Sequence, residues 1–209
     1  MNNRTHGKIK AMESATGQIP DVLLRTTDLL MISVPAMPEM LIADCLKADG
    51  RVICYRSPRL DSLLTRRTPA VGRGLVRYFE LGDEGKMTSE QMLRASLMVG
   101  PGPVDREQRR NVSAWGRTFH PEQVADLARR TKTNRNRKSE ETGLVLEHDK
   151  ANLFLIEDEA DGIFVLNIHY YHLGCDVDVY PLDSDQIWPR GTRLFARIRL
   201  VKRSPPVET

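Results

Sequence analysis

The chain has 209 residues, 40% of them hydrophobic and 28% charged, a composition typical of one large globular domain or two small ones with a genuine core. No stretch approaches the roughly 18 consecutive apolar residues of a membrane-spanning helix. Residues 1–20 are polar, lack the apolar centre of a secretory signal and predict a flexible N-terminal arm, so we expect a cytoplasmic protein without a membrane partner.

The charge is segregated along the chain. Residues 1–138 carry 24 basic and 15 acidic side chains, residues 139–187 carry one basic and 12 acidic ones, and residues 188–209 carry six basic and one acidic. Arginine outnumbers lysine 23 to 8. The guanidinium fork suits phosphate and carboxylate partners, so an arginine-rich, nucleic-acid-binding surface is one interpretation; a bias toward arginine codons is the other.

Three cysteines limit the redox and metal chemistry. Cys45, Cys54 and Cys175 are widely spaced and form no Cys-x-x-Cys pair, which excludes zinc-ribbon and thioredoxin-type motifs. Cys45 and Cys54 lie in apolar stretches, so we expect both to be buried in the core and expect no disulfide.

The first elements predicted along the chain are a strand, a helix and a second strand. Residues 28–35 form an apolar run that ends at a proline, which predicts a buried strand. A helix is predicted over 38–50, with Pro38 in its first turn and Gly50 at its end, and a strand over 51–56. Together they predict a βαβ unit with a parallel strand pair.

This unit resembles the late part of a Rossmann-type methyltransferase, in which an aspartate-led strand and a helix lead into a segment such as Asp-Gly-Arg-Val, here residues 49–52. The resemblance covers only residues 28–57. No glycine-rich loop precedes it, and Gly72-Arg73-Gly74 lacks the third glycine of a dinucleotide fingerprint, so we do not expect methyltransferase activity.

Further along, one strand and two helices are predicted. The strand is the LVRYFEL segment at 75–81. Thr88 or Ser89 can cap the first helix, and the second is a short helix over 120–130 with His120 as its entry residue.

Residues 131–142 contain no apolar side chain and predict a basic polar linker. The chain then divides into a flexible arm, a mixed α/β portion, this linker, an antiparallel β portion and a frayed tail, at residues 1–20, 21–130, 131–142, 143–203 and 204–209. Strands are predicted beyond the linker at 143–149, 151–159, 162–171, 175–182 and 192–201. We therefore expect an α+β fold whose βαβ-containing N-terminal portion is followed by a mainly antiparallel sheet or small barrel.

The stretch NIHYYHLGCDVDVY, residues 167–180, concentrates side chains that can carry chemistry. Alternate residues of a strand share a face. The core face is expected to comprise Phe164, Leu166, Ile168 and Tyr170. The opposite face, toward solvent or a cleft, comprises Asn167, His169 and Tyr171. On the next strand, Asp176 and Asp178 share one face.

Paired carboxylates at this spacing can hold Mg²⁺. The Asp-Val-Asp-Val pattern resembles that of metal-dependent phosphoryl and nucleotidyl transferases, although the glycine-serine lead-in of those enzymes is missing. This enzyme alternative assigns Asp176 and Asp178 as metal ligands and catalytic residues, with His169 as acid–base group. The ordinary alternative is a solvated strand face, which alternates polar and apolar residues in the same way.

Other chemistries have weaker support. His169, His172 and Cys175 reach one zinc ion only if a turn at 172–174 brings them together. The sequence contains no G-x-S-x-G, no H-E-x-x-H, no papain-like cysteine context and no Walker A loop.

The segment from 129 to 138 is strongly basic, with six cations in ten residues and no acid. Such an arm neutralises phosphates with little sequence preference, although a solvated linker has the same composition. Its cations are Arg129, Arg130, Lys132, Arg135, Arg137 and Lys138.

The last predicted strand places several arginines on one face, with an aromatic ring between them. These residues are Arg193, Phe195, Arg197, Arg199 and Arg203. The row is suited to a nucleic-acid platform, or to pairing with acidic strands of the same sheet.

The leading hypothesis is therefore a small nucleic-acid-binding protein that uses its arginine-rich surface. A Mg²⁺-dependent nuclease or phosphotransferase is the first alternative. The second is a protein-interaction or inhibitor module that uses the acidic block 139–187 to bind a protein partner.

Overall fold

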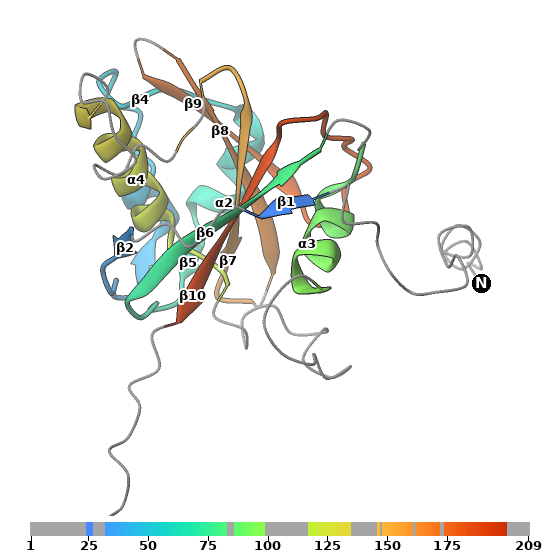
Figure 1. Ribbon diagram of the computed structural model, residues 1–209. Helices are drawn as coiled ribbons and strands as arrows, with labels where there is room; N and C mark the ends of the chain where they lie inside the picture. The colour runs from blue at the N-terminus through green and yellow to red at the C-terminus, as the bar shows by residue number, and fades with distance from the viewer. Residues whose placement is uncertain are drawn as a thin grey trace, which may run out of the picture.

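The computed structural model describes residues 24–26, 32–82, 86–98, 117–134, 146, 148–160, 162–171 and 174–199, which form an α+β fold (Figure 1). The strands are β1 (Leu24–Thr26), β2 (Ser33–Val34), β3 (Met40–Leu41), β4 (Ile53–Arg56), β5 (Arg67–Thr68), β6 (Gly74–Leu81), β7 (Ala151–Glu157), β8 (Ile163–Tyr170), β9 (Cys175–Pro181) and β10 (Arg193–Arg199). The helices are α1 (Ile42–Cys45), α2 (Asp61–Leu64), α3 (Ser89–Met98) and α4 (Pro121–Asn134), with a 3₁₀ helix, η2, at Pro58–Leu60.

The strands form one eight-stranded sheet in the order β1-β6-β10-β7-β8-β9-β4, with β2 also paired to β6, and a separate pair of β3 and β5. β10 runs parallel to β7, and β4 runs parallel to β9, while the other pairings are antiparallel. The sheet is therefore mixed rather than antiparallel. Among the described strands β1 and β4 end the path, so the barrel alternative is not formed.

The predicted βαβ unit over residues 28–56 is wrong. β2 pairs antiparallel with β6, whereas β4 pairs with β9 at the far end of the sheet, so the two expected partners are not neighbours. The helix between them is only α1, which leaves Pro38 outside it. Before β4 the Asp49 carboxylate accepts hydrogen bonds from the backbone N–H groups of Arg51 and Val52, a local turn that competes with helix.

The two predicted helices are formed, and their caps explain where they begin. Thr88 and Gln91 make a reciprocal capping box at the start of α3, with N···O distances of 2.9 and 3.3 Å. At the start of α4, His120 Nδ1 accepts a hydrogen bond from the Glu122 N–H, as expected for an entry residue. α4 continues through Thr131–Asn134, which corrects the linker prediction there, because Thr131 is buried and its hydroxyl donates to the Leu127 carbonyl.

The later strands agree with the sequence at four of the five predicted positions, at β7, β8, β9 and β10. The strand predicted at 143–149 is not formed by its described residues, Leu146, His148 and Asp149, which lie in a bend and a turn. Asp149 has a φ of 58°, a left-handed conformation that an extended strand does not contain.

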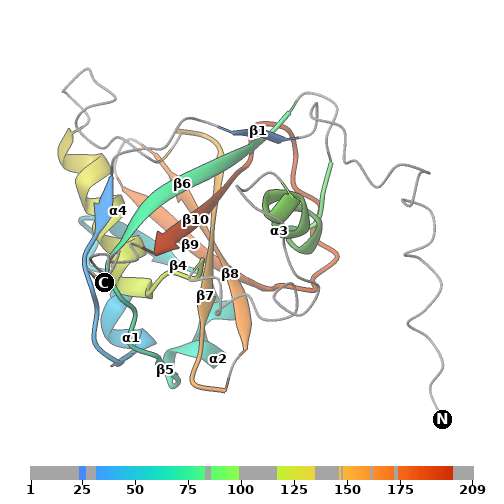
Figure 2. The ribbon, with the colours of Figure 1, turned by 60° about the horizontal axis from the view of Figure 1, so that its bottom comes forward.

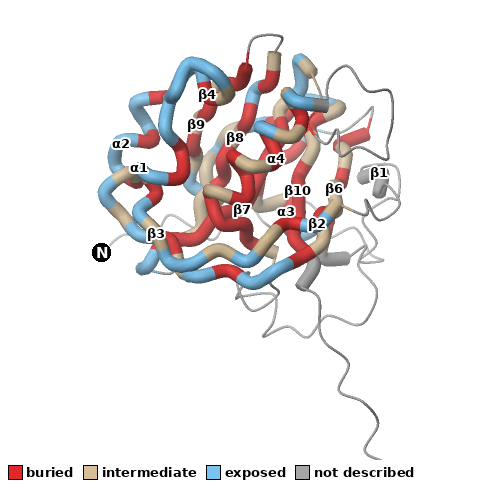
Figure 3. Tube along the Cα trace, turned by 90° about the vertical axis from the view of Figure 1, so that its left-hand side faces the viewer, coloured by how far each residue is buried: buried red, intermediate tan, exposed pale blue. Residues whose placement is uncertain are grey.

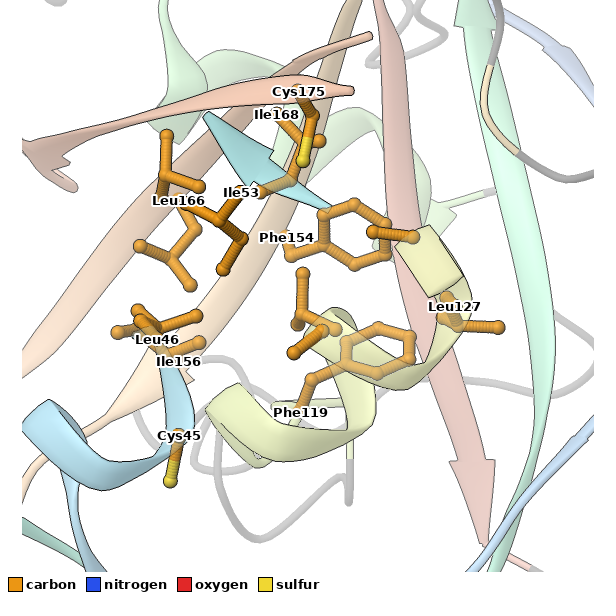
Figure 4. Packing of buried hydrophobic residues seen from close by; sticks show 14 of the residues in the cluster. Cys45, Leu46, Ile53, Phe119, Leu127, Phe154, Ile156, Leu166, Ile168 and Cys175 are labelled. Carbon is orange, nitrogen blue, oxygen red and sulfur yellow. The ribbon is translucent and has the colours of Figure 1, made fainter. Parts of the chain in front are cut away.

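Helices α4 and α3 cover opposite faces of the sheet (Figures 1 and 2). On β7, Phe154 and Ile156 belong to the core cluster that includes α4, while Leu153 and Leu155 belong to the cluster that includes α3. The strand is therefore buried on both sides, as a central strand between two helical layers must be. Figure 4 shows the larger cluster, where the rings of Phe119 and Phe154 meet edge to face at 5.2 Å.

His120 predicts a pH-dependent loss of stability. The side chain is fully buried, and this burial, partly opposed by the Pro38 backbone, lowers the pKa of His120 from 6.5 to about 4. As the pH falls from 6.5 to 4, the unfolded chain takes up a proton that the folded one does not, so the free energy of unfolding decreases by up to about 3 kcal/mol.

Replacing His120 by Asn keeps an N-cap acceptor but removes the titrating group. Urea unfolding above pH 6.5 and near pH 4 should therefore show a smaller pH-dependent loss for the variant than for the wild type. Equal losses in the two proteins would contradict the assignment.

Candidate functional site

The strands β4, β8 and β9 border an open hollow of about 660 Å³. Its aromatic side chains are Tyr55, His169, Tyr171 and Tyr180. Its polar side chains are Ser57, Arg59, Asn167, Asp176 and Asp178. The hollow thus combines flat rings with hydrogen-bonding groups on one concave surface.

Strand register brings the residues of the enzyme alternative together. β8 and β9 pair antiparallel, with His169 opposite Asp176 and Asn167 opposite Asp178. Leu166, Ile168 and Tyr170 are buried in the larger core cluster and Phe164 packs against it, so the predicted core face of β8 is confirmed. The neighbouring polar side chains therefore point to the hollow.

Both aspartates accept hydrogen bonds from tyrosines of the same hollow. The Tyr171 hydroxyl donates to Asp176, and the Tyr180 hydroxyl donates to Asp178 at 2.8 Å. Asp178 also accepts a hydrogen bond from Arg59 at 3.3 Å, and that guanidinium lies 5.0 Å from the centre of the Tyr180 ring. Burial, followed by the aspartate partner, raises the pKa of both tyrosines.

The metal alternatives remain predictions, since the described residues show the Asp176 and Asp178 pair in the hollow without a larger ligand group. Among those residues, no group of three or more His, Cys, Asp or Glu side chains is arranged to hold a metal ion. The zinc alternative also needs His172, which lies outside the described residues.

The described basic residues of the predicted arm, Arg129, Arg130 and Lys132, lie in the second half of α4. Arg129 pairs with Glu122 at 2.5 Å, and Arg130 pairs with Asp126 and donates to the Ser33 carbonyl. Lys132 donates to the backbone carbonyl of Arg51, just before β4. The remaining cations of the arm, Arg135, Arg137 and Lys138, lie outside the described residues.

The described part of the last strand does not form the exposed arginine row that the sequence predicts. Phe195 is fully buried and stacks on Phe154, with ring centres 4.5 Å apart. Arg197 is buried and donates to the carbonyls of Thr118 and Gly72. Arg193 pairs with Glu80 on β6, which agrees with the cross-strand alternative. The side chain of Arg199 and the whole of Arg203 lie outside the described part of the structure.

The acidic block does not form one exposed face in its described part. Glu157 and Asp158 are buried, and Asp158 pairs with Arg66 at 2.5 Å. Asp176 and Asp178 line the hollow, while Asp183 is exposed in the loop after β9.

Strand β4 contributes residues that the sequence reasoning missed. It ends the sheet among the described strands, and Figure 3 shows exposed backbone at β4. Tyr55 on it is 52% exposed, and Arg51 and Arg59 are also exposed. The signal was present in the sequence as a tyrosine among closely spaced arginines, RVICYRSPR. Its meaning depends on the pairing of β4 with β9, which lies more than a hundred residues away along the chain.

The cysteines differ in exposure. Cys45 and Cys175 are buried, and burial raises the pKa of each thiol to about 12. Cys54 is exposed, which corrects the prediction of a buried thiol: the pairing of β4 with β9 shifts register between Ile53 and Tyr55, and Cys54 lies at this irregularity. No disulfide joins the three cysteines, all of which lie in the described ranges.

β4 and β9 approach closely at Gly174. A Cβ atom on this residue would lie 2.7 Å from the Val52 carbonyl oxygen and closer still to the Cys54 sulfur. Such distances are far below ordinary van der Waals contact, so the junction has no room for a side chain.

The Asp176–Tyr171 hydrogen bond predicts a shift in alkaline titration. Replacing Asp176 by Asn removes the negative charge that disfavours tyrosinate, so the pKa of Tyr171 should fall. Tyrosinate absorbance should then appear at lower pH than in the wild type. Asp183→Asn, which changes the same charge outside the hollow, should leave the curve unchanged, and superimposable curves for Asp176→Asn would contradict the contact.

Comparison of the chain with protein-family models, with curated proteins and with solved structures gives no match. Among the helices of the described ranges, none is long and apolar enough to cross a membrane.

Proposed function

We propose that this protein binds single-stranded nucleic acid along strand β4. The observation that carries the proposal is the exposed Tyr55, which lines the hollow. Along the chain Tyr55 lies between two basic residues, Arg51 and Arg59. At the start of the strand, Lys132 contacts Arg51, and beyond its end Arg59 borders the hollow. Among the described strands β4 ends the sheet, and Cys54 and Tyr55 on it are exposed.

The chemistry of this edge fits unpaired nucleotides better than a duplex. Bases of a single strand can stack on exposed aromatic side chains, while a duplex hides those base faces between neighbouring pairs. Tyr55, His169 and Tyr171 supply rings within one hollow. Phosphates would be bound by the flanking cations, which act without regard to sequence.

The proposal assigns the nucleic-acid contacts to a different set of basic residues from the set that the sequence predicts. Arg51, Arg59 and Lys132 replace the buried Arg197 as the main expected contacts. Arg129 and Arg130 lie on the same helix as Lys132, and the proposed contribution of Arg135, Arg137 and Lys138 continues from there.

Fluorescence anisotropy with labelled single-stranded DNA and RNA, measured over a range of salt concentrations, tests the proposal. Tyr55→Ala should weaken binding by about 1–3 kcal/mol, because one stacking surface is lost, while the melting temperature stays nearly unchanged. Lys132→Gln should reduce the slope of log affinity against log salt by about 0.7, the value for one phosphate contact on a single strand.

Arg94 provides a matched control. Its side chain is 60% exposed and pairs with Glu90, much as the 61% exposed Arg59 pairs with Asp178, but it lies on α3. Arg94→Gln should leave affinity unchanged while Arg59→Gln lowers it. Absence of binding by the wild type at low salt, or equal effects of the two substitutions, would reject the proposal.

The same samples test the enzyme alternative, since the hollow does bring Asp176, Asp178 and His169 together. Under the proposal, the oligonucleotide stays intact with Mg²⁺ or Mn²⁺. Cleavage that a chelator stops, and that the double variant Asp176→Asn with Asp178→Asn lacks, would favour the nuclease instead.

A further inference from the structure

The hollow already holds one flat group that donates hydrogen bonds. The Arg59 guanidinium lies over the Tyr180 ring at 5.0 Å and donates to the Asp178 carboxylate at 3.3 Å. The Arg59 side chain is 61% exposed, so solvent reaches it and it is not locked in the core. This contact shows which kind of group the surface formed by Tyr180 and Asp178 accommodates: a planar π system with N–H donors at its edge.

Two carboxylates are the charged acceptors of the hollow: Asp176 accepts a hydrogen bond from Tyr171, and Asp178 accepts hydrogen bonds from Tyr180 and Arg59. Asp176 and Asp178 present carboxylate oxygens, and the buried Oδ1 atom of Asn167 has no hydrogen-bond partner among the described residues. Asn167 lies directly opposite Asp178 in the strand register, so these acceptors are neighbours. The unmatched Asn167 oxygen is costly to leave without a donor and favours a ligand that brings N–H groups.

We infer that the hollow is a pocket for a nucleobase that carries an amino group. This inference rests on the proposed binding of single-stranded nucleic acid and names the bases which that site prefers. Cytosine, adenine and guanine present an amino group beside a planar ring, the same combination as the Arg59 guanidinium. Uracil and thymine present a carbonyl oxygen at the ring position where cytosine has its amino group, and the aspartates repel that oxygen.

The inference also gives different roles to the negative and the positive side chains around the hollow. The aspartates inside the hollow would repel phosphates, so the backbone runs outside it along Arg51 and Lys132 while the base enters. Arg59, which lies at the rim between the two, leaves the face of Tyr180 when a base stacks there.

Hexamers of deoxycytidine and deoxyuridine give the sharpest test, because the two bases share one ring and differ at positions 3 and 4, where cytosine presents an acceptor nitrogen and an amino group and uracil an N–H group and a carbonyl. The wild type should bind the deoxycytidine hexamer about tenfold more tightly, the factor that one hydrogen bond to a charged acceptor supplies. Asp178→Asn should bring the ratio close to one, because an amide can donate to the uracil carbonyl as well as accept.

Asp183→Asn is the control, since it makes the same charge change on an exposed residue outside the hollow, and it should keep the wild-type ratio. Asp176→Asn serves as a second variant if Asp178→Asn unfolds, and circular dichroism checks both. Equal binding of the two hexamers, or tighter binding of deoxyuridine, would overturn the inference while the proposed function stands. Failure of the wild type to bind either hexamer would reject both.

Discussion

The burial of strands β7 and β10 on both faces is the constraint on which the rest of the molecule depends. Their parallel pairing places Phe195 beside Phe154 in the larger core cluster, while Leu153 and Leu194 face the other cluster. A charged residue can enter such a strand only if its hydrogen bonds are satisfied. Arg197 meets this requirement by binding the carbonyls of Thr118 and Gly72, and so ties the segments before α4 and before β6 to the centre of the sheet.

The hollow lies at the end of the sheet where the described helices no longer cover both faces. On β8, Ile163 and Val165 face the cluster that contains α3, while Asn167 and His169 continue the same face beyond it. No described helix packs on this end of the face, where His169 is exposed. The outer strands β9 and β4 extend this uncovered face to the edge of the sheet, which explains why aromatic and charged side chains gather at that end of the fold.

Local patterns in the sequence were reliable where the structure depends on neighbours in the chain. The alternation on β8, the capping box at Thr88 and the grouping of His169 with Asp176 all follow from short-range spacing and an adjacent hairpin. The errors arose where distant partners decide. The amphipathic pattern of the last strand concealed the buried Arg197, whose partners are far away along the chain, and residues 28–56 formed no βαβ unit because β2 and β4 pair with remote strands. The contributions of Tyr55 and Arg59 to the site were missed for the same reason.

Because the chain passes so closely at Gly174, replacing this glycine by a larger residue would also affect the shape of the hollow. β4 contributes Tyr55 to one wall, and β9 contributes Asp176 and Asp178 to the floor. A methyl group at position 174 would press on Val52 and Cys54 and push the two strands apart. Because Cys54 is exposed, a bulky adduct on its sulfur would act as a wedge at the same junction. A residue that does not line the hollow therefore limits how closely the chain segments of β4 and β9 approach each other beside it.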